Sequence, residues 1–236
     1  MSVHMQRELE RLKKLFLGVS TLVEENLRDS MKSALERDRD LALRVIEKDH
    51  EIDRTEVSVE EECLKLLALY QPVANDLRYI IAILKINHDL ERVGDLAVNI
   101  AERALILCEN TPVSRDFGLH EMSARVQRML ARSLDSMLNY DVQLAKDVWL
   151  SDDGIDEANR STVTTIEDEI ARDQKDLRAL LALIGISRTL ERVADHATNI
   201  SKDVIYMIAG EIVRHRSGYF RGKTDSPPER SPGAPA

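Results

Sequence analysis

Apolar residues recur every three or four positions along two long segments that begin near residues 75 and 176. This spacing gathers the apolar side chains on one face of an α-helix. A helix with such a face packs against antiparallel neighbours in a helical bundle. The two stripes are Ile83, Ile86, Leu90, Val93, Ala97, Ile100, Ala104 and Leu107, and then Leu183, Ile186, Leu190, Val193, Ala197, Ile200, Val204 and Met207.

Capping and breaking residues divide each half of the chain into three predicted helices. In the first half the helices are expected over about 6–35, from Asp38 or Asp40 to about 69, and over about 75–108, with a break at Gln71-Pro72. In the second half they are expected to begin near Leu119, Asp141 and Asp176. The segment Ile80–Leu84 is apolar almost all round, which predicts a second buried face against the other bundle.

We therefore expect an all-α fold of two tandem, pseudo-symmetric three-helix bundles, with six long helices. The last residues hold four of the six prolines, are net basic and have no periodicity, which is typical of disorder. The predicted divisions are a first bundle over 1–108, a linker over 109–118, a second bundle over 119–212 and a disordered C-terminal tail over 213–236.

Composition narrows the class of protein. The 236 residues carry a formal net charge of −9, which argues against sequence-independent binding of nucleic acid by the body of the protein. Cys63 and Cys108 form no CxxC pair, so no disulfide framework is expected. The N-terminus lacks the apolar stretch of a signal peptide, and the longest apolar runs are too short to span a bilayer. A cytoplasmic protein is expected.

One acidic phrase occurs twice in the chain. Residues 89–103 read DLERVGDLAVNIAER, and residues 189–203 read TLERVADHATNISKD. Core positions need only an apolar residue of suitable size, so a repeat kept for packing alone should drift. The recurrence of charged and amide residues in identity calls instead for a chemical explanation.

The duplicated acids predict two groups of carboxylates. Glu91 and Asp95 lie four residues apart, on one helix face, as do Asp49 and Asp53 on the preceding helix. Folding that hairpin at Pro72 sets Asp53 opposite Glu91 and Asp49 opposite Asp95. The same operation in the second half sets Asp156 opposite Glu191 and Asp152 opposite Asp195.

Four carboxylates at one level repel one another unless they share protons, pair with arginine or hold a cation. Arg92 and Arg192 are near in sequence but are expected to point about 100° away around the helix. Oxygen ligands suit hard cations such as Mg, Ca, Mn or ferric iron. The predicted ligands lie off the apolar stripe and hence near the surface, with Asn99 and Asn199 in support; they are Asp49, Asp53, Glu91, Asp95, Asp152, Asp156, Glu191 and Asp195.

Other interpretations stay open at this point. Charges on a helix face are usually only solvated, which would leave a structural scaffold. His50, His88 and His196 are optional ligands, because none of them recurs in the other half. The alternative function is a carboxylate-bridged metal enzyme or iron-handling protein of the ferritin-like kind, although that class pairs Glu-x-x-His motifs inside the bundle core. No motif predicts a catalytic residue.

Two tandem units with a DLR helix start and an ERVGD-like phrase resemble the PhoU family of phosphate-transport accessory proteins. The resemblance rests on QPVANDLR at 71–78, LERVGDLAVNIAE at 90–102 and LERVADHATNIS at 190–201, and covers nearly the whole chain to about residue 212. It implies a negative regulator of phosphate uptake and of the phosphate-starvation response, and no enzymatic activity. It also implies a phosphate ABC transporter and a sensor histidine kinase as partners, a homodimer, and iron, Mn or Mg on the eight carboxylates.

Overall fold

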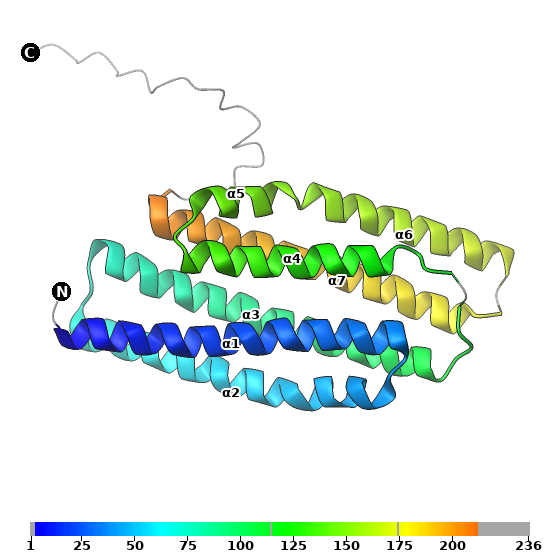
Figure 1. Cartoon of the computed structure of the whole chain (residues 1–236), viewed down its shortest axis with the longest axis horizontal. Helices are drawn as coiled ribbons and strands as arrows, with labels where there is room; N and C mark the ends of the chain where they lie inside the picture. The colour runs from blue at the N-terminus through cyan, green and yellow to red at the C-terminus, as the bar shows by residue number, and fades with distance from the viewer. Residues whose placement is uncertain (1–2, 114, 174, 212–236) are drawn as a thin grey trace, which may run out of the picture.

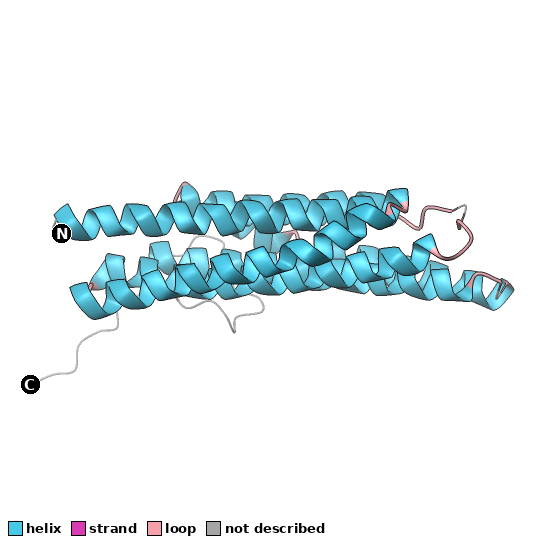
Figure 2. Ribbon diagram, turned by 90° about the horizontal axis from the view of Figure 1, so that it is seen from below, coloured by secondary structure: helices cyan, strands magenta, loops and turns pink. Residues whose placement is uncertain are grey.

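The computed structural model describes residues 3–113, 115–173 and 175–211, and these residues form an all-α fold without a strand (Figure 2). Three helices build the first half: α1 (Val3–Glu36), α2 (Arg39–Tyr70) and α3 (Ala74–Cys108). Four build the second: α4 (Leu119–Leu138), α5 (Val142–Leu150), α6 (Asp153–Arg172) and α7 (Leu177–Ala209). Figure 1 shows the two halves side by side as elongated bundles. The predicted fold class is confirmed, whereas the tail over 213–236 lies outside the described residues.

Matching caps start the second helix of each bundle. The carboxylate of Asp38 accepts a hydrogen bond from the backbone N–H of Leu41 at 2.9 Å, and Asp141 does the same for Leu144 at 2.9 Å. Each cap satisfies one backbone donor that the first helical turn leaves without a partner. The alternative start at Asp40 is wrong, because Asp40 already lies in the first turn of α2.

The second bundle differs from the prediction of six helices, because α5 and α6 replace one long helix. The chain tightens at Ser151, whose hydroxyl donates to the carbonyl of Val148 at 2.7 Å, and Gly154 donates its N–H to the carbonyl of Ser151 at 3.3 Å. Ser, Asp and Gly are weak helix formers because their side chains or backbone favour other conformations. The equivalent positions of α2 hold Lys48 and Glu51, and α2 continues unbroken.

The two bundles share one hydrophobic core. Buried side chains of α1, α2 and α3 belong to the same contiguous cluster as those of α4, α5 and α7. The most extensive contact between any two helices joins α3 to α7, which run antiparallel through the centre of the molecule. This contact confirms that α3 is buried on a second face. Among the described residues, no helix is long and apolar enough to cross a membrane.

Candidate functional site

The first acidic set consists of Asp49 and Asp53 on α2 with Glu91 and Asp95 on α3. Asp49 is half-buried between the two helices. Partial burial, followed by the charges of Asp53 and Asp95, raises the pKa of Asp49 to about 6. The pKa of Glu91 is also raised, first by burial and then by Asp95. The fold thus brings the four predicted residues into one electrostatically coupled group.

A glycine allows α2 and α3 to approach each other at this set. A Cβ atom at Gly94 would lie 3.3 Å from Asp49 Oδ1 and 3.3 Å from Ile52 Cγ2, which is tighter than most real Cβ contacts. The second repeat holds Ala194 at this position, and its side chain is buried. The close approach of Asp49 to α3 is therefore a local property of the first set.

Arg92 contradicts the expectation that it points away from the carboxylates. Its Nη1 donates to Asp95 Oδ2 at 2.9 Å, and its Nε lies 3.2 Å from Glu91 Oε2. The backbone direction of Arg92 was predicted correctly, but a long guanidinium side chain can fold back along its own helix. Arg92 therefore neutralises part of the first set from its exposed edge.

The second acidic set consists of Asp152 and Asp156 at the start of α6 with Glu191 and Asp195 on α7. Burial, followed by Asp195 and Asp156, raises the pKa of Asp152 to about 6, and the nearby hydroxyl of Thr198 offsets part of the rise. The pKa of Glu191 is raised by burial and then by Asp156. The repeat thus recreates the coupled carboxylates at the interruption between α5 and α6.

Buried amides connect the two sets to the core in different ways. In the second set, Asn159 donates its Nδ2–H to Glu191 Oε2 at 2.6 Å and accepts from the hydroxyl of Ser187 at 2.7 Å. In the first set the position equivalent to Asn159 is Glu56, which accepts from Asn87 Nδ2 at 2.8 Å and has no N–H to offer Glu91.

Sequence reasoning missed Glu56 as a fifth acid of the first set. Burial, then the charges of Glu60 and Glu91, raises the pKa of the Glu56 carboxyl. The spacing along the helix could have placed Glu56 in the first set, because Glu56 follows Asp53 by three residues on the same helix face. Glu56 does not recur in the second repeat, where Asn159 occupies the equivalent position.

The amides and histidines expected to support the acidic sets lie at different distances from them. Asn99 donates to the backbone carbonyl of Asp95 at 2.9 Å and so lies beside the first set. Asn199 is exposed on α7 and lines a groove between the bundles. His88 Nδ1 lies 3.8 Å from Glu91 Oε2, whereas His196 Nδ1 lies 2.8 Å from Asp89 Oδ1 on the other bundle. The exposed His50 adjoins Asp49 and lowers its pKa slightly against the larger effects of burial and the neighbouring acids.

Both sets supply carboxylate oxygens, the ligand type that hard cations prefer, although the side chains do not converge on one point. One buried oxygen in each set, Glu91 Oε2 and Asp152 Oδ1, has no hydrogen-bond partner, because the contact of Glu91 with Arg92 is poorly aligned. Such an atom is costly to bury unless something compensates it. Within the described residues, no three His, Cys, Asp or Glu side chains converge closely enough to hold a metal ion as they stand. Ion binding would therefore require the carboxylates to change rotamer.

Comparison with known proteins places this geometry in a family. The model of the PhoU domain matches residues 16–104 and again residues 119–204, one match in each bundle. The chain belongs to the PhoU family. The two matched segments contain all eight carboxylates that the sequence singled out.

Similar proteins extend over nearly the full PhoU fold. The chain is 38% identical to the phosphate-specific transport system accessory protein PhoU homolog of Aquifex aeolicus, over 89% of this chain and 95% of that protein. It is 36% identical to PhoU homolog 1 of Thermotoga maritima, over 93% and 94%. The crystal structure of PhoU from Pseudomonas aeruginosa superposes with a TM-score of 0.85 at 35% identity, over 87% of this chain and 99% of that one.

Proposed function

We propose that this protein is a regulatory adaptor of phosphate transport, which restrains phosphate uptake and the phosphate-starvation response. The PhoU relatives that it resembles are named as accessory proteins of the phosphate-specific transport system. On this proposal the chain acts on the cytoplasmic side as a homodimer and docks to the phosphate ABC transporter, to a sensor histidine kinase, or to both. It acts by binding its partners and not by catalysis.

The observation that carries the adaptor proposal is the pair of acidic sets near the surface, one between α2 and α3 and the other between α6 and α7. Both sets lie outside the shared apolar core and remain partly open to solvent. A di-metal enzyme of the ferritin-like kind instead builds its site from side chains that project into the bundle core. The placement of the acidic sets therefore favours a surface that contacts a partner and argues against an enclosed reaction centre.

The second part of the proposal is that each set binds a hard cation such as iron, Mn or Mg. Glu91 and Asp152 each contribute a buried oxygen without a hydrogen-bond partner, and a cation would supply the missing interaction. The pKa values of Asp49 and Asp152 are raised first by burial and then by the neighbouring acids, and a bound cation would offset both effects. Partner groups or phosphate oxygens could complete the coordination at an open site.

Metal analysis tests the second part directly. Protein purified without chelator should carry iron, Mn or Mg by elemental analysis, and a Glu91→Gln, Glu191→Gln double variant should lose it. Glu51→Gln, an exposed change on α2 outside both sets, is the matched control and should keep the metal. Equal metal content in all three proteins would contradict cation binding by these carboxylates.

Capture from phosphate-replete cells tests the adaptor. The tagged chain should recover a component of the phosphate transporter or a sensor kinase, and loss of the protein should switch on a phosphate-starvation reporter in rich phosphate. A reporter that stays silent after deletion, together with recovery of neither partner, would overturn the regulatory role even if metal binds.

A further inference from the structure

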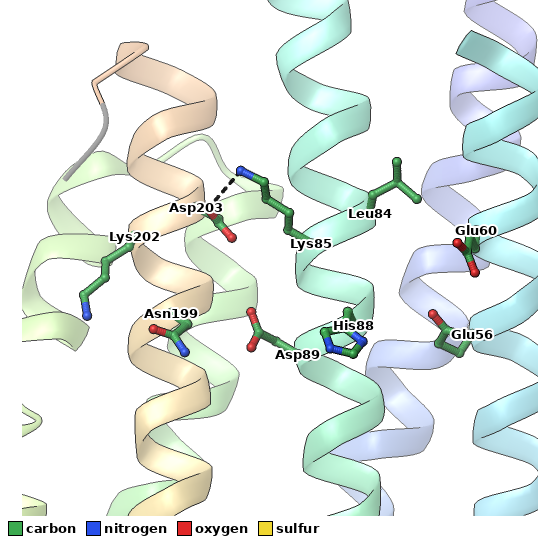
Figure 3. A pocket seen from close by; sticks show the side chains of 9 residues that line it. All are labelled: Glu56, Glu60, Leu84, Lys85, His88, Asp89, Asn199, Lys202 and Asp203. Atoms are coloured by element: carbon green, nitrogen blue, oxygen red, sulfur yellow. Dashed lines mark ion pairs between the residues drawn. The ribbon is translucent and has the colours of Figure 1, made fainter. Parts of the chain in front are cut away.

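Two hollows of the described structure differ in the charge of the side chains that line them. A groove of about 750 Å³ crosses α3 between α2 and α7, with Glu56 and Glu60 at its α2 edge (Figure 3). A smaller hollow of about 190 Å³ lies between α4 and the break that separates α5 from α6. Among the described residues that line the smaller hollow none is acidic, and we call it the arginine pocket after Arg125, Arg128 and Arg132.

The three arginines share one face of α4. They follow one another at intervals of three and four residues, the spacing that aligns side chains along a helix. Arg125 is half-buried, whereas Arg128 and Arg132 are exposed. Like charges at this spacing repel one another and destabilise the helix unless an anion is near.

Apolar side chains complete the wall of the arginine pocket. Met129 of α4, Val148 of α5 and Ile155 of α6 are buried there. An apolar wall keeps water from one side of the guanidinium groups, which strengthens their attraction for an anion. The volume would hold roughly six water molecules, whereas pockets for drug-sized ligands begin at about 300 Å³. The pocket therefore suits a small ion.

The charge of the arginines is only partly compensated. Arg132 Nη2 lies 3.7 Å from Asp147 Oδ2, and among the described residues no carboxylate lies within ion-pair distance of Arg125 or Arg128. Three guanidinium groups and one carboxylate leave a charge of +2 at the pocket. A phosphate group carries about −1.5 to −2 at pH 7, which matches that charge.

The first bundle holds an ion pair where the second has this pocket. The aspartate caps of the second helices put equivalent residues of the two bundles 103 positions apart. In the first bundle, Lys48 of α2 donates to Glu25 Oε2 of α1 at 2.8 Å. The equivalent positions hold Ser151 and Arg128, so one charge is lost and the other is reversed. An arginine beside a hollow thus replaces a satisfied pair.

A glycine makes room for Arg125 at the pocket. A Cβ atom at Gly154 would lie 2.5 Å from Arg125 Nη2, closer than real Cβ contacts come. The equivalent positions of the first bundle hold Glu51 and Leu22, so this glycine and this arginine occur together only in the second bundle. The guanidinium group therefore lies against the start of α6 through a local adaptation of this pocket.

We propose that the arginine pocket binds a small tetrahedral oxyanion of the phosphate class, either free phosphate or the phosphoryl group of a small ester. Arg125 and Arg128 donate hydrogen bonds to its oxygens, and Arg132 adds a further donor when it leaves Asp147. The planar fork of donors on arginine fits two oxygens of a phosphate group at once. This inference does not depend on the proposed function, because it uses no residue of either acidic set.

Isothermal titration calorimetry of the full-length chain with inorganic phosphate tests the proposal. Metal is removed and the chelator is dialysed away, so that phosphate cannot bind through a cation at the acidic sets. In about 0.05 M chloride the chain should bind one phosphate with a Kd of about 1 mM or tighter. Methyl phosphate serves as the second probe: tighter binding than that of phosphate identifies an ester as the ligand, and weaker binding identifies the free ion.

Three variants that each lower the net charge by one separate the pocket from the general field of the protein. Arg125→Gln should weaken phosphate binding about fivefold, because a charged hydrogen bond is lost. Arg128→Glu with Ser151→Lys rebuilds the ion pair of the first bundle and should weaken binding about tenfold. Arg28→Gln, in the neighbouring groove between α1 and α4, is the matched control and should change nothing.

Gly154→Ala tests the pocket without any change in charge. The added methyl group displaces the guanidinium group of Arg125 and should weaken phosphate binding about threefold. Thermal unfolding of each variant checks that the helices are intact.

Three results would overturn the proposal. The first is the absence of saturable phosphate binding to the metal-free chain up to about 10 mM, including binding that appears only after Mn²⁺ is added. The second is an equal loss of affinity in Arg28→Gln and Arg125→Gln, which would mean that only the general field attracts the anion. The third is full affinity in the variant that combines Arg128→Glu with Ser151→Lys.

Discussion

The two acidic sets share their spacing but differ in how the fold compensates them. In the second set, Glu191 accepts a hydrogen bond from Asn159, which in turn is held by Ser187. In the first set, Glu56 replaces that donor with another acid, and Glu91 Oε2 is left buried without a hydrogen-bond partner. The repeat therefore preserves the same carboxylates in both halves, while the change from Asn159 to Glu56 behind them removes a hydrogen-bond donor from the first set.

The neighbouring cations differ as well. Arg92 spans Glu91 and Asp95 at the first set. At the second set, Asp195 is next to His196, which pairs with Asp89 across the bundle contact. The first set nevertheless holds one more acid, Glu56, where the second set has the amide donor Asn159. We expect it to bind a divalent cation more tightly, because affinity rises with the number of converging carboxylates.

Single substitutions should change the cation affinity of one acidic set at a time, and this is the strongest change that we predict. Glu91→Gln should weaken Mn²⁺ binding at the first set by about tenfold or more and leave the second unchanged, whereas Glu191→Gln should do the reverse. Isothermal titration calorimetry of each variant against the unaltered protein measures both sites. Loss of both sites in either variant would mean that the carboxylates do not form two independent groups.

A substitution behind the first set should make it resemble the second. Glu56→Gln keeps an oxygen for Asn87 and adds an N–H for Glu91, so the metal-free protein should gain about 1 kcal/mol of unfolding free energy. The reverse change, Asn159→Asp, should cost about 2 kcal/mol because it removes the donor to Glu191 and adds a charge at a buried site. Urea denaturation measures both, and a loss of stability in Glu56→Gln would contradict this account.

The stability of the metal-free protein should depend on pH through Asp49 in the first set and Asp152 in the second. The folded pKa values of Asp49 and Asp152, about 6, exceed the value of about 4 for an unfolded aspartate, so the folded state binds more protons between these limits. Stability of the metal-free protein should be highest at the acid end of this window and fall as pH rises through about 6. Asp49→Asn should remove about 1 kcal/mol of that loss, after allowance for solvent screening.

The control for this series is Asp40→Asn, an exposed change in the first turn of α2 away from both sets. Its pH profile should run parallel to that of the unaltered protein. A profile of Asp49→Asn that also runs parallel would show that burial and the neighbouring acids do not act on Asp49 as described.

Adding a methyl group at Gly94, beside the first set, should change the free energy of unfolding least of all. Gly94→Ala gains helix propensity but presses on Asp49 and Ile52, so unfolding free energy should change by no more than about 0.5 kcal/mol. Ala194→Gly, which only loses propensity and buried contact, should cost about 1 kcal/mol or more. Thermal unfolding resolves the difference, and a loss in Gly94→Ala as large as that in Ala194→Gly would show that the first set does not accommodate the extra methyl group.

Local sequence was sufficient for most of the helices but not for every side chain. The caps at Asp38 and Asp141 follow from short-range hydrogen bonding, so their positions could be predicted. The interruption near Ser151 was missed, because the apolar stripe continues across it and only the run of weak helix formers marks it. Arg92 was misjudged for a similar reason, since a helical wheel gives the direction of Cβ and not the reach of a long side chain.

Periodicity and duplication by themselves determined that the chain forms two helical bundles and that its recurring acids lie on matched helix faces. Those properties are set by spacing along one helix, which every copy of the repeat carries within itself. Only the tertiary structure decided that Glu56 joins the first set, that Glu91 and Asp152 each bury an oxygen without a hydrogen-bond partner, and that a groove opens across α3. Those features depend on which side chain another helix presents at the same level, and packing determines that choice.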